Sequence, residues 1–292
     1  MQGIFNSIKN LKSEPMKNHT TFRIGGPAKY VFMPANVDEI KAVIDYCRAE
    51  NERYIILGNG SNVLFMDEGY DGVIIQIFSN MNKISLEDNI IYGEAGALLS
   101  KMAALAKDNS LSGMEFAAGI PGTLGGAVVM NAGAYGGEMK DIIEYVDVLE
   151  SDGSTKRYSC DEMDFGYRHS IINSDRIVLG AAVKLVPSDK KIIEDKMNEL
   201  KEARVSKQPL EYPSAGSTFK RPEGYFAGKL IQDAGLKGYK VGGAMVSDKH
   251  SGFVVNIDNA TAKDVLTLMD DVKKKVYDMF GVLLEPEVKI IR

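Results

Sequence analysis

Gly119-Ile-Pro-Gly-Thr-Leu-Gly-Gly-Ala-Val-Val-Met-Asn-Ala-Gly-Ala-Tyr-Gly136 is the stretch on which the fold depends, because it interleaves glycines with small apolar residues. A linker that faces solvent would be polar, so this composition predicts a segment that is buried and closely packed. Glycine lacks Cβ, which lets the backbone approach a neighbouring group and lets its N–H groups converge on an anion. A large ligand with a pyrophosphate and a flat ring system fits such a segment.

Glycine is concentrated in two places. It accounts for 29 of 292 residues, and eight glycines lie between residues 113 and 137. A shorter run, Gly58-Asn-Gly-Ser-Asn-Val63, directly follows a predicted apolar strand. We call residues 58–63 the first glycine loop and residues 119–137 the second. Turn formation explains either loop alone, whereas two clusters together favour a ligand. The first loop is no Rossmann fingerprint, because Val63 stands where a glycine is required.

The composition excludes several classes of protein. With 45% hydrophobic and 26% charged residues, the chain has the composition of a soluble globular protein. A net charge of −5 without a dense Lys/Arg block argues against nucleic-acid binding. The apolar runs are far shorter than the roughly 18 residues of a membrane span, and the N-terminus lacks a secretion signal, so we expect a cytoplasmic protein. Two cysteines and three dispersed histidines predict no metal site.

Hydrophobic periodicity predicts an α+β chain that ends in a separate α/β unit. Asp38 is expected to cap the helix that begins there, and the capping box Thr261-x-x-Asp264 is expected to open the last helix. Pro209 ends a charged helix, which places a domain boundary near Gln208. The expected helices span residues 38–51, 98–109, 188–206 and 261–281, with another beginning near 227, and the expected strands span residues 54–57, 73–78, 90–92, 145–150, 177–186, 217–219, 252–257 and 283–291.

Both glycine loops resemble the FAD-binding loops of the UDP-N-acetylenolpyruvoylglucosamine reductase family. Together with the two loops, four further segments make six matches that run in order between residues 18 and 288, which argues against chance. The four segments are Asn18-His-Thr-Thr-Phe-Arg-Ile-Gly-Gly-Pro-Ala28, Phe165-Gly-Tyr-Arg-His-Ser170, Pro213-Ser-Ala-Gly-Ser-Thr-Phe-Lys220 and Glu285-Pro-Glu-Val288. The resemblance implies a FAD-binding fold of the vanillyl-alcohol oxidase/PCMH type in two subdomains, residues 1–70 and 71–207, and a substrate-binding domain over 208–292. The chain is similar to the shorter family branch, which lacks a tyrosine-bearing insertion.

The family reduces UDP-N-acetylglucosamine enolpyruvate to UDP-N-acetylmuramate with NADPH, a step of cytoplasmic peptidoglycan precursor synthesis. The resemblance therefore implies non-covalently bound FAD as cofactor and NADPH as co-substrate, and we expect a monomer. Arg23 would contact FAD together with the two glycine loops. The matched loop residues are Gly58, Asn59, Gly60, Ser61, Asn62, Gly119, Pro121, Gly122, Thr123, Gly126, Ala127, Asn131 and Gly133.

Three matched positions imply catalytic roles. Ser217 corresponds to the family's proton donor, and Gly216 lets the chain bring its hydroxyl close to the substrate. Arg168 matches the active-site arginine, whose planar fork suits a carboxylate. Glu287 matches the third catalytic position and would help to stabilise the enolate, protonated or paired in the complex.

Four further residues, Tyr167, Lys220, Lys229 and Gln232, are predicted substrate contacts. Arg221 stands where the family usually has asparagine, which leaves that one contact open.

Three alternatives are open. Ser217-Thr-Phe-Lys220 also fits the Ser-x-x-Lys motif of acyl-transfer enzymes, although the accompanying Ser-Asp-Asn and Lys-Thr-Gly motifs are missing. A flavin-binding module without catalysis would keep the glycine loops but has no need for the three catalytic residues. An oxidase on the same fold would use oxygen as its electron acceptor.

Overall fold

The computed structural model describes residues 2–292, which form interspersed helices and strands and confirm the predicted α+β class. The α-helices are α1 (Gln2–Ser7), α2 (Val37–Ala49), α3 (Leu99–Asp108), α4 (Leu124–Val129), α5 (Lys190–Lys207), α6 (Ala227–Asp233) and α7 (Ala262–Phe280), and the 3₁₀ helices are η1 (Met16–His19), η2 (Glu115–Ala117), η3 (Met139–Asp141) and η4 (Asp161–Met163). The strands are β1 (Asn10–Pro15), β2 (Pro27–Phe32), β3 (Tyr54–Leu57), β4 (Val63–Phe65), β5 (Tyr70–Gln76), β6 (Ile84–Glu87), β7 (Ile90–Glu94), β8 (Leu111–Ser112), β9 (Gly133–Ala134), β10 (Gly137–Glu138), β11 (Ile143–Leu149), β12 (Thr155–Ser159), β13 (Ile177–Lys184), β14 (Val186–Pro187), β15 (Ser214–Ser217), β16 (Lys240–Val241), β17 (Ala244–Val246), β18 (Phe253–Asn256) and β19 (Lys289–Ile291).

The chain forms two compact units, and each is discontinuous in sequence. Unit 1 consists of Met1–Leu11, Tyr30–Asn59 and Gly72–Ala203, and unit 2 of Lys12–Lys29, Gly60–Asp71 and Arg204–Arg292. Each unit is discontinuous because distant segments pair, as the strand β4 pairs in parallel with the C-terminal β19 in unit 2. The division into three consecutive domains over residues 1–70, 71–207 and 208–292 stays a prediction. Each unit has its own apolar core.

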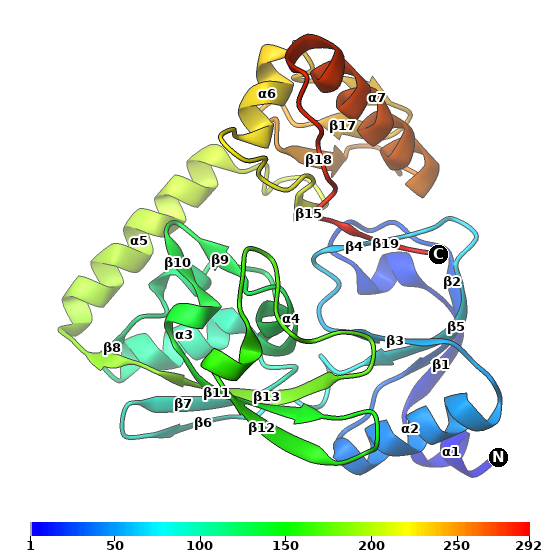
Figure 1. The fold of residues 1–292 in the computed structure, drawn as a ribbon, viewed down its shortest axis with the longest axis vertical. Coiled ribbons are helices and arrows are strands. Elements are labelled where there is room, and N and C mark those ends of the chain that lie inside the picture. Colours follow the sequence, from blue (N-terminus) through cyan, green and yellow to red (C-terminus); the bar gives the residue numbers. More distant parts are fainter. Residues whose placement is uncertain (1) are drawn as a thin grey trace. The chain divides into compact units, whose positions relative to one another are not determined.

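Unit 1 is built on an antiparallel sheet of strand order β12-β11-β13-β7-β6. The helices α3 and α4 pack on one part of this sheet, near β7 and β13 (Figure 1). Gly93 allows close approach there, because a Cβ on it would lie 2.9 Å from both Leu124 Cδ2 and Met102 Sδ and would push these side chains aside. The short α4 is therefore held by packing, since its sequence Leu-Gly-Gly-Ala-Val-Val has low helix propensity.

The first glycine loop follows β3, which pairs in parallel with β5 in a sheet of order β1-β2-β5-β3. The helix α2 before it buries Ile40, Val43, Ile44 and Cys47, as its periodicity predicts. The predicted cap at Asp38 is wrong. Asn36 caps the helix, because its side chain accepts from the Glu39 N–H at 2.9 Å, and Asp38 instead places its charge in the first turn.

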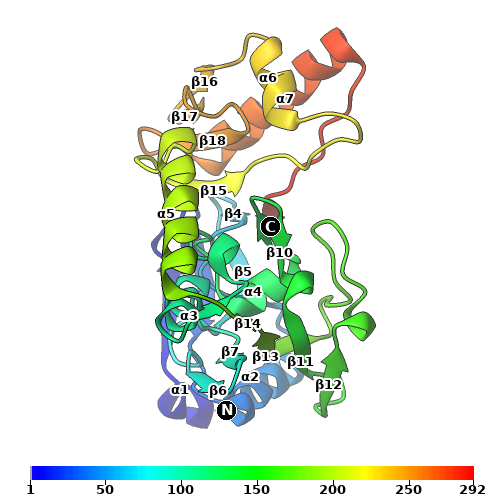
Figure 2. The same ribbon diagram turned by 90° about the vertical axis from the view of Figure 1, so that its left-hand side faces the viewer.

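Unit 2 contains a sheet of order β15-β18-β17-β16 with α6 and α7, which pack against each other, while α7 also contacts β16 and β17 (Figure 2). The capping box predicted at Thr261 and Asp264 is confirmed. Asp67 adds to it, because its carboxylate accepts from the N–H groups of Ala262 and Lys263 at 2.8 and 3.0 Å.

The last strand is shorter than the expected 283–291. Only Lys289–Ile291 pairs as β19, whereas Pro286 forms an isolated bridge with Phe219. Among the helices of residues 2–292, none has the length and apolar character needed to cross a bilayer.

Candidate functional site

The two glycine loops meet in unit 1. The Asn59 side-chain amide donates to the backbone oxygen of Pro121 at 2.7 Å. A Cβ on Gly58 would lie 2.4 Å from Thr123 Oγ1, so only glycine fits at this contact. Loops that are far apart in sequence thus form one continuous surface.

The Pro121–Gly126 end of the second loop offers backbone to a ligand. Pro121 and Gly126 are exposed, and Thr123 caps α4 with a 3.5 Å contact from the Gly126 N–H to its hydroxyl. Within residues 2–292, no protein group accepts from the N–H groups of Asn59, Gly119 and Gly122. Unpaired amides beside exposed glycine suit an anionic, closely approaching ligand such as a dinucleotide pyrophosphate.

Several other glycines of the second loop pack against protein. A Cβ on Gly125 would lie 2.9 Å from Ala95 Cβ, one on Gly133 2.7 Å from the Gly137 oxygen, and one on Gly137 2.7 Å from the Phe116 ring. Part of the glycine surplus therefore serves the packing of the fold, and this part includes one predicted cofactor contact, Gly133. Ala127, another predicted cofactor contact, is buried as well, at 3% exposure.

Arg168 lies at the tip of a tight turn in unit 1. Gly166 and His169 exchange backbone hydrogen bonds of 3.1 and 3.2 Å, which leaves Tyr167 and Arg168 between them. Arg168 has φ of 55°, a left-handed conformation that costs a side-chain-bearing residue roughly 1–2 kcal/mol. Its guanidinium lies 5.0 Å from the ring centroid of Tyr167, which is 54% exposed. Strain at such a residue is typical of functional sites.

The turn is anchored on both sides by the end of α4. The buried Asn131 donates from Nδ2 to the Gly166 oxygen at 3.1 Å, and Ser170 donates from Oγ to the Val129 oxygen at 2.9 Å. Asn131 is a predicted cofactor contact, but its side chain is 0% exposed and hydrogen-bonds within the protein. Its side chain therefore serves the protein and is not open to a ligand.

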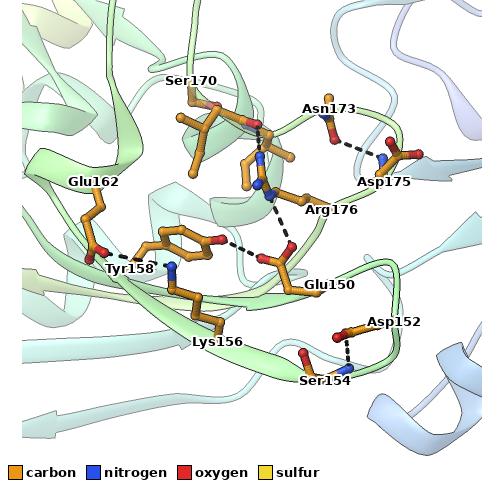
Figure 3. Close-up of polar contacts among 12 residues, drawn as sticks. Glu150, Asp152, Ser154, Lys156, Tyr158, Glu162, Ser170, Asn173, Asp175 and Arg176 are labelled. Carbon is orange, nitrogen blue, oxygen red and sulfur yellow. Dashed lines mark hydrogen bonds and ion pairs between the residues drawn. The ribbon is translucent and has the colours of Figure 1, made fainter.

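A further network holds the chain after the turn. Arg176 donates to Glu150 at 3.2 Å and to the Ile171 oxygen at 3.3 Å, and Tyr158 donates to the second Glu150 oxygen at 2.6 Å (Figure 3). Glu150 follows β11 and Tyr158 lies on β12, so the loop is tied to the sheet. No local pattern indicates this network, since its residues are separated along the chain.

In unit 2, the segment around Arg23 meets both the first glycine loop and β15. The Thr21 N–H donates to the Gly60 oxygen at 3.2 Å, and the Thr21 hydroxyl donates to the Ser214 oxygen at 2.7 Å. A Cβ on Gly60 would lie 2.1 Å from the His19 oxygen. Arg23 follows in a left-handed conformation with φ of 56°, and it is exposed.

Ser217 is presented by a bulge in β15. Ser214 pairs with Val255 and Ser217 with Phe253, so β15 contains one extra residue across this interval. Gly216 takes up the bulge with φ of 75°, and Ser217 is exposed. Because a bulge re-aims the following side chain, the local backbone explains why this serine leaves the sheet surface.

Glu287 lies on the segment beside Ser217 and Thr218. Its N–H donates to the Thr218 oxygen at 2.9 Å, and its own backbone oxygen accepts from Asn62 Nδ2 at 3.3 Å. Unit 2 thus brings together Ser217, Glu287 and the predicted loop residues Gly60, Ser61 and Asn62. Arg168 and Tyr167 belong to unit 1, together with Gly58, Asn59 and the second glycine loop.

The predicted substrate contacts of unit 2 are exposed or half-buried. Lys220 pairs with Glu285 at 3.1 Å and Lys229 with Asp233 at 2.6 Å, whereas Gln232 lies on the exposed side of α6. Exposed pairs contribute little, so both ammonium groups can exchange these partners for a phosphate. The guanidinium of Arg221 lies 4.0 Å from the centroid of the Phe226 ring.

Burial raises the pKa of the Cys47 thiol to about 12, which makes it a poor nucleophile.

Sequence reasoning missed the anchoring role of Asn131 and Ser170. One signal existed, because an asparagine directly after a helix often takes the left-handed conformation that ends it. Asn131 has φ of 39° and follows α4 by two residues.

Among residues 2–292, no three His, Cys, Asp or Glu side chains gather as metal ligands.

Comparison with known proteins first shows the class of protein to which the chain belongs. The FAD binding domain family matches residues 28–159, which hold both loops that meet at Asn59 and Pro121. The predicted FAD-binding fold is thereby confirmed. A second family, the C-terminal domain of UDP-N-acetylenolpyruvoylglucosamine reductase, matches residues 208–291.

The chain belongs to the UDP-N-acetylenolpyruvoylglucosamine reductase family. It is 54% identical to the reductase of Agathobacter rectalis, covering 96% of this chain and 93% of that protein. It is 52% identical to the reductase of Caldanaerobacter subterraneus subsp. tengcongensis, with 96% and 92% covered. The crystal structure of the reductase from Thermus caldophilus superposes with a TM-score of 0.84 at 38% identity, over 98% of this chain and 99% of that one.

Proposed function

We propose that the protein reduces UDP-N-acetylglucosamine enolpyruvate to UDP-N-acetylmuramate with NADPH, as a step of peptidoglycan precursor synthesis in the cytoplasm. The observation that carries the proposal is the bulge that presents an exposed Ser217 beside Glu287, in a unit that also holds residues 60–63 of the first glycine loop. Relatives that are named as this reductase and are similar over nearly the whole chain support it.

The residues present fit FAD, because unpaired amides and exposed glycine backbone occur where the two glycine loops touch. Bound FAD would accept a hydride from NADPH and deliver it to the β-carbon of the enolpyruvyl group. The two glycine loops and Arg23 would hold FAD without a covalent link. The residues proposed for this are Arg23, Gly58, Asn59, Gly60, Ser61, Asn62, Gly119, Pro121, Gly122, Thr123 and Gly126, with Ala127, Asn131 and Gly133 supporting the loop from behind.

Arg168 would bind the substrate carboxylate. Its planar guanidinium stays charged and can form two parallel hydrogen bonds, which fixes the enolpyruvyl group and offsets negative charge as it develops. Tyr167, beside it in the turn, would contact the substrate with its exposed ring.

Ser217 would give its hydroxyl proton to the α-carbon. A serine hydroxyl is a weak acid, so this step needs a strongly basic carbon acceptor held close to Oγ. Glu287 would help to stabilise the same carbanion-enolate. Lys220, Lys229 and Gln232 would bind the diphosphate or sugar of the substrate, and the protein would act as a monomer.

Two measurements on the purified protein test this function. The protein should carry FAD, seen as flavin absorption in the blue, and NADPH consumption should depend on added UDP-N-acetylglucosamine enolpyruvate. NADPH oxidation that needs only oxygen would indicate an oxidase instead. Protein that takes up FAD but transfers no hydride to the enolpyruvyl substrate would overturn the proposal. The acyl-transfer alternative is disfavoured by the missing Ser-Asp-Asn and Lys-Thr-Gly motifs.

A further inference from the structure

One buried amide joins the second glycine loop to the turn that carries Arg168. Asn131 is fully buried, and its Nδ2 donates to the Gly166 oxygen at 3.1 Å, two residues before Arg168. Ser170, two residues after Arg168, donates to the Val129 oxygen at 2.9 Å. Both hydrogen bonds tie the turn to the end of α4, and their attachment points at Gly166 and Ser170 lie on either side of the strained arginine.

The orientation of the Asn131 amide is fixed by its other partners. Nδ2 also donates to Glu138 Oε2 at 2.5 Å, and Oδ1 accepts from the Lys140 N–H at 2.9 Å. A flipped amide would lose all three bonds, because oxygen would face two acceptors and nitrogen a donor. Glu138 is held in turn, since its other oxygen lies 2.8 Å from Lys140 Nζ, a hydrogen bond that raises the pKa of Lys140.

We infer that Asn131 is a positioning residue: anchored by Glu138, its amide holds the Gly166–His169 turn and so directs Arg168 toward the substrate carboxylate. The inference rests on the proposed function, which gives Arg168 that role. It replaces the direct contact with the cofactor that the resemblance implies for Asn131. A residue held in a left-handed conformation keeps it only when its surroundings impose it, and Asn131 supplies one of the two flanking bonds.

Paired substitutions separate positioning from folding. Asn131→Asp removes the donor to Gly166 and sets two carboxylates against each other, so it should also destabilise the protein. Adding Glu138→Gln relieves this repulsion, because the new amide at position 138 can donate to the introduced carboxylate while its oxygen still accepts from Lys140. The double variant N131D/E138Q thus restores the local packing and the net charge but not the bond to Gly166. Asn89→Asp is the matched control, since Asn89 donates to the Leu185 oxygen at 2.7 Å in the same unit.

Two readouts on N131D/E138Q test the inference. Hydrogen exchange over residues 165–171 should be faster than in wild type, while that of β11 and β13 is unchanged. In stopped flow, reduction of the bound flavin by NADPH should stay within about twofold of wild type, whereas reoxidation by the enolpyruvyl substrate should slow by roughly tenfold or more, because a misplaced arginine loses its alignment with the carboxylate. Asn89→Asp should leave both half-reactions unchanged.

The inference is overturned if exchange over residues 165–171 is unchanged, or if reoxidation stays within about twofold of wild type. A loss of FAD affinity with normal exchange in the turn would overturn it too, because Asn131 would then serve the cofactor. Failure of the proposed function looks different: wild-type flavin would be reduced by NADPH yet not reoxidised by the substrate.

Discussion

The turn that carries Arg168 and the strand that carries Ser217 are held by different kinds of bond. Side chains hold the turn, through Asn131, Ser170 and, further along, Arg176. Backbone pairing holds Ser217, through the bulge in β15 and the hydrogen bond from the Glu287 N–H to the Thr218 oxygen. The arginine should therefore respond to distant side-chain substitutions, whereas the serine should respond to changes of backbone conformation and tolerate replacement of its neighbours' side chains.

The largest effect is expected for Ser217→Ala, which tests whether the backbone-held residue does the chemistry. Because β15 pairs through its backbone, the variant should fold and bind FAD as wild type does, and NADPH should reduce its flavin normally. Loss of the proton donor should slow reoxidation by substrate by roughly 100-fold or more. Ser217→Cys, which keeps an acidic proton, should retain part of the rate. If both half-reactions of Ser217→Ala match wild type, Ser217 is not the donor.

Gly216→Ala tests the backbone itself. An alanine Cβ would meet nothing within 4 Å, but φ of 75° is strained for any side-chain-bearing residue. We expect the bulge to relax and reoxidation to slow by roughly tenfold, in line with small misplacement of a catalytic group. Gly281→Ala is the matched control, because Gly281 also has open space and φ of 67° but lies at the end of α7. If both variants lose the same stability but only Gly216→Ala slows reoxidation, the backbone at Ser217 matters for catalysis. Equal reoxidation rates in the two variants would contradict this.

The sequence predicted the class of fold, the contact-forming glycine loops and the capping box of α7. These features depend on local signals, namely loop composition and helix-end residues. It did not predict α4, because its helical state depends on the packing of Gly125 against Ala95 and of Leu124 near Gly93. Nor did it predict that Asn131 faces the protein, since the bond to Gly166 joins residues 35 positions apart.

The same reason explains the errors at segment ends. The strand expected from 283 is interrupted because Pro286 bridges to Phe219, a partner 67 residues away, so only the last residues pair as β19. The units combine distant segments for the same cause. Long-range pairing of this kind leaves no local pattern in the sequence.

A weaker effect is expected for Arg176→Lys, which tests how far side-chain control of the turn extends. Lysine keeps the charge but lacks the planar guanidinium, which donates from different nitrogens to Glu150 and to the Ile171 oxygen. The site is partly exposed, so we expect only about a two- to threefold slower reoxidation by substrate. Arg157→Lys is the control, because Arg157 makes a similar pair with Asp147 on the same sheet without a bond to the loop. Similar slowing by both variants would show that the network around Glu150 has no special link to Arg168.

The smallest kinetic effect is expected for Asp264→Asn, because this residue stabilises unit 2 without touching the bulge. Its carboxylate accepts from the Thr261 N–H at 3.0 Å, and this backbone hydrogen bond lowers the pKa of Asp264. A lowered pKa means that the stabilisation is present above the unfolded value near 4 and is lost as the pH falls through the folded value.

At neutral pH the asparagine variant should lose about 0.5–1 kcal/mol in the free energy of unfolding, a modest amount for a capping group that is partly exposed. The difference from wild type should shrink as the pH falls below about 4 and through the lowered folded value, because the carboxylate is protonated in both states only below that value. Denaturant titrations across this pH range measure it, with Asp270→Asn, an exposed change on the same helix, as control. Flavin reduction and reoxidation should both match wild type, since the bulge depends on pairing with β18. A selective loss of reoxidation in the folded variant would instead mean that the position of Ser217 depends on α7, and that the backbone of β15 does not hold it alone.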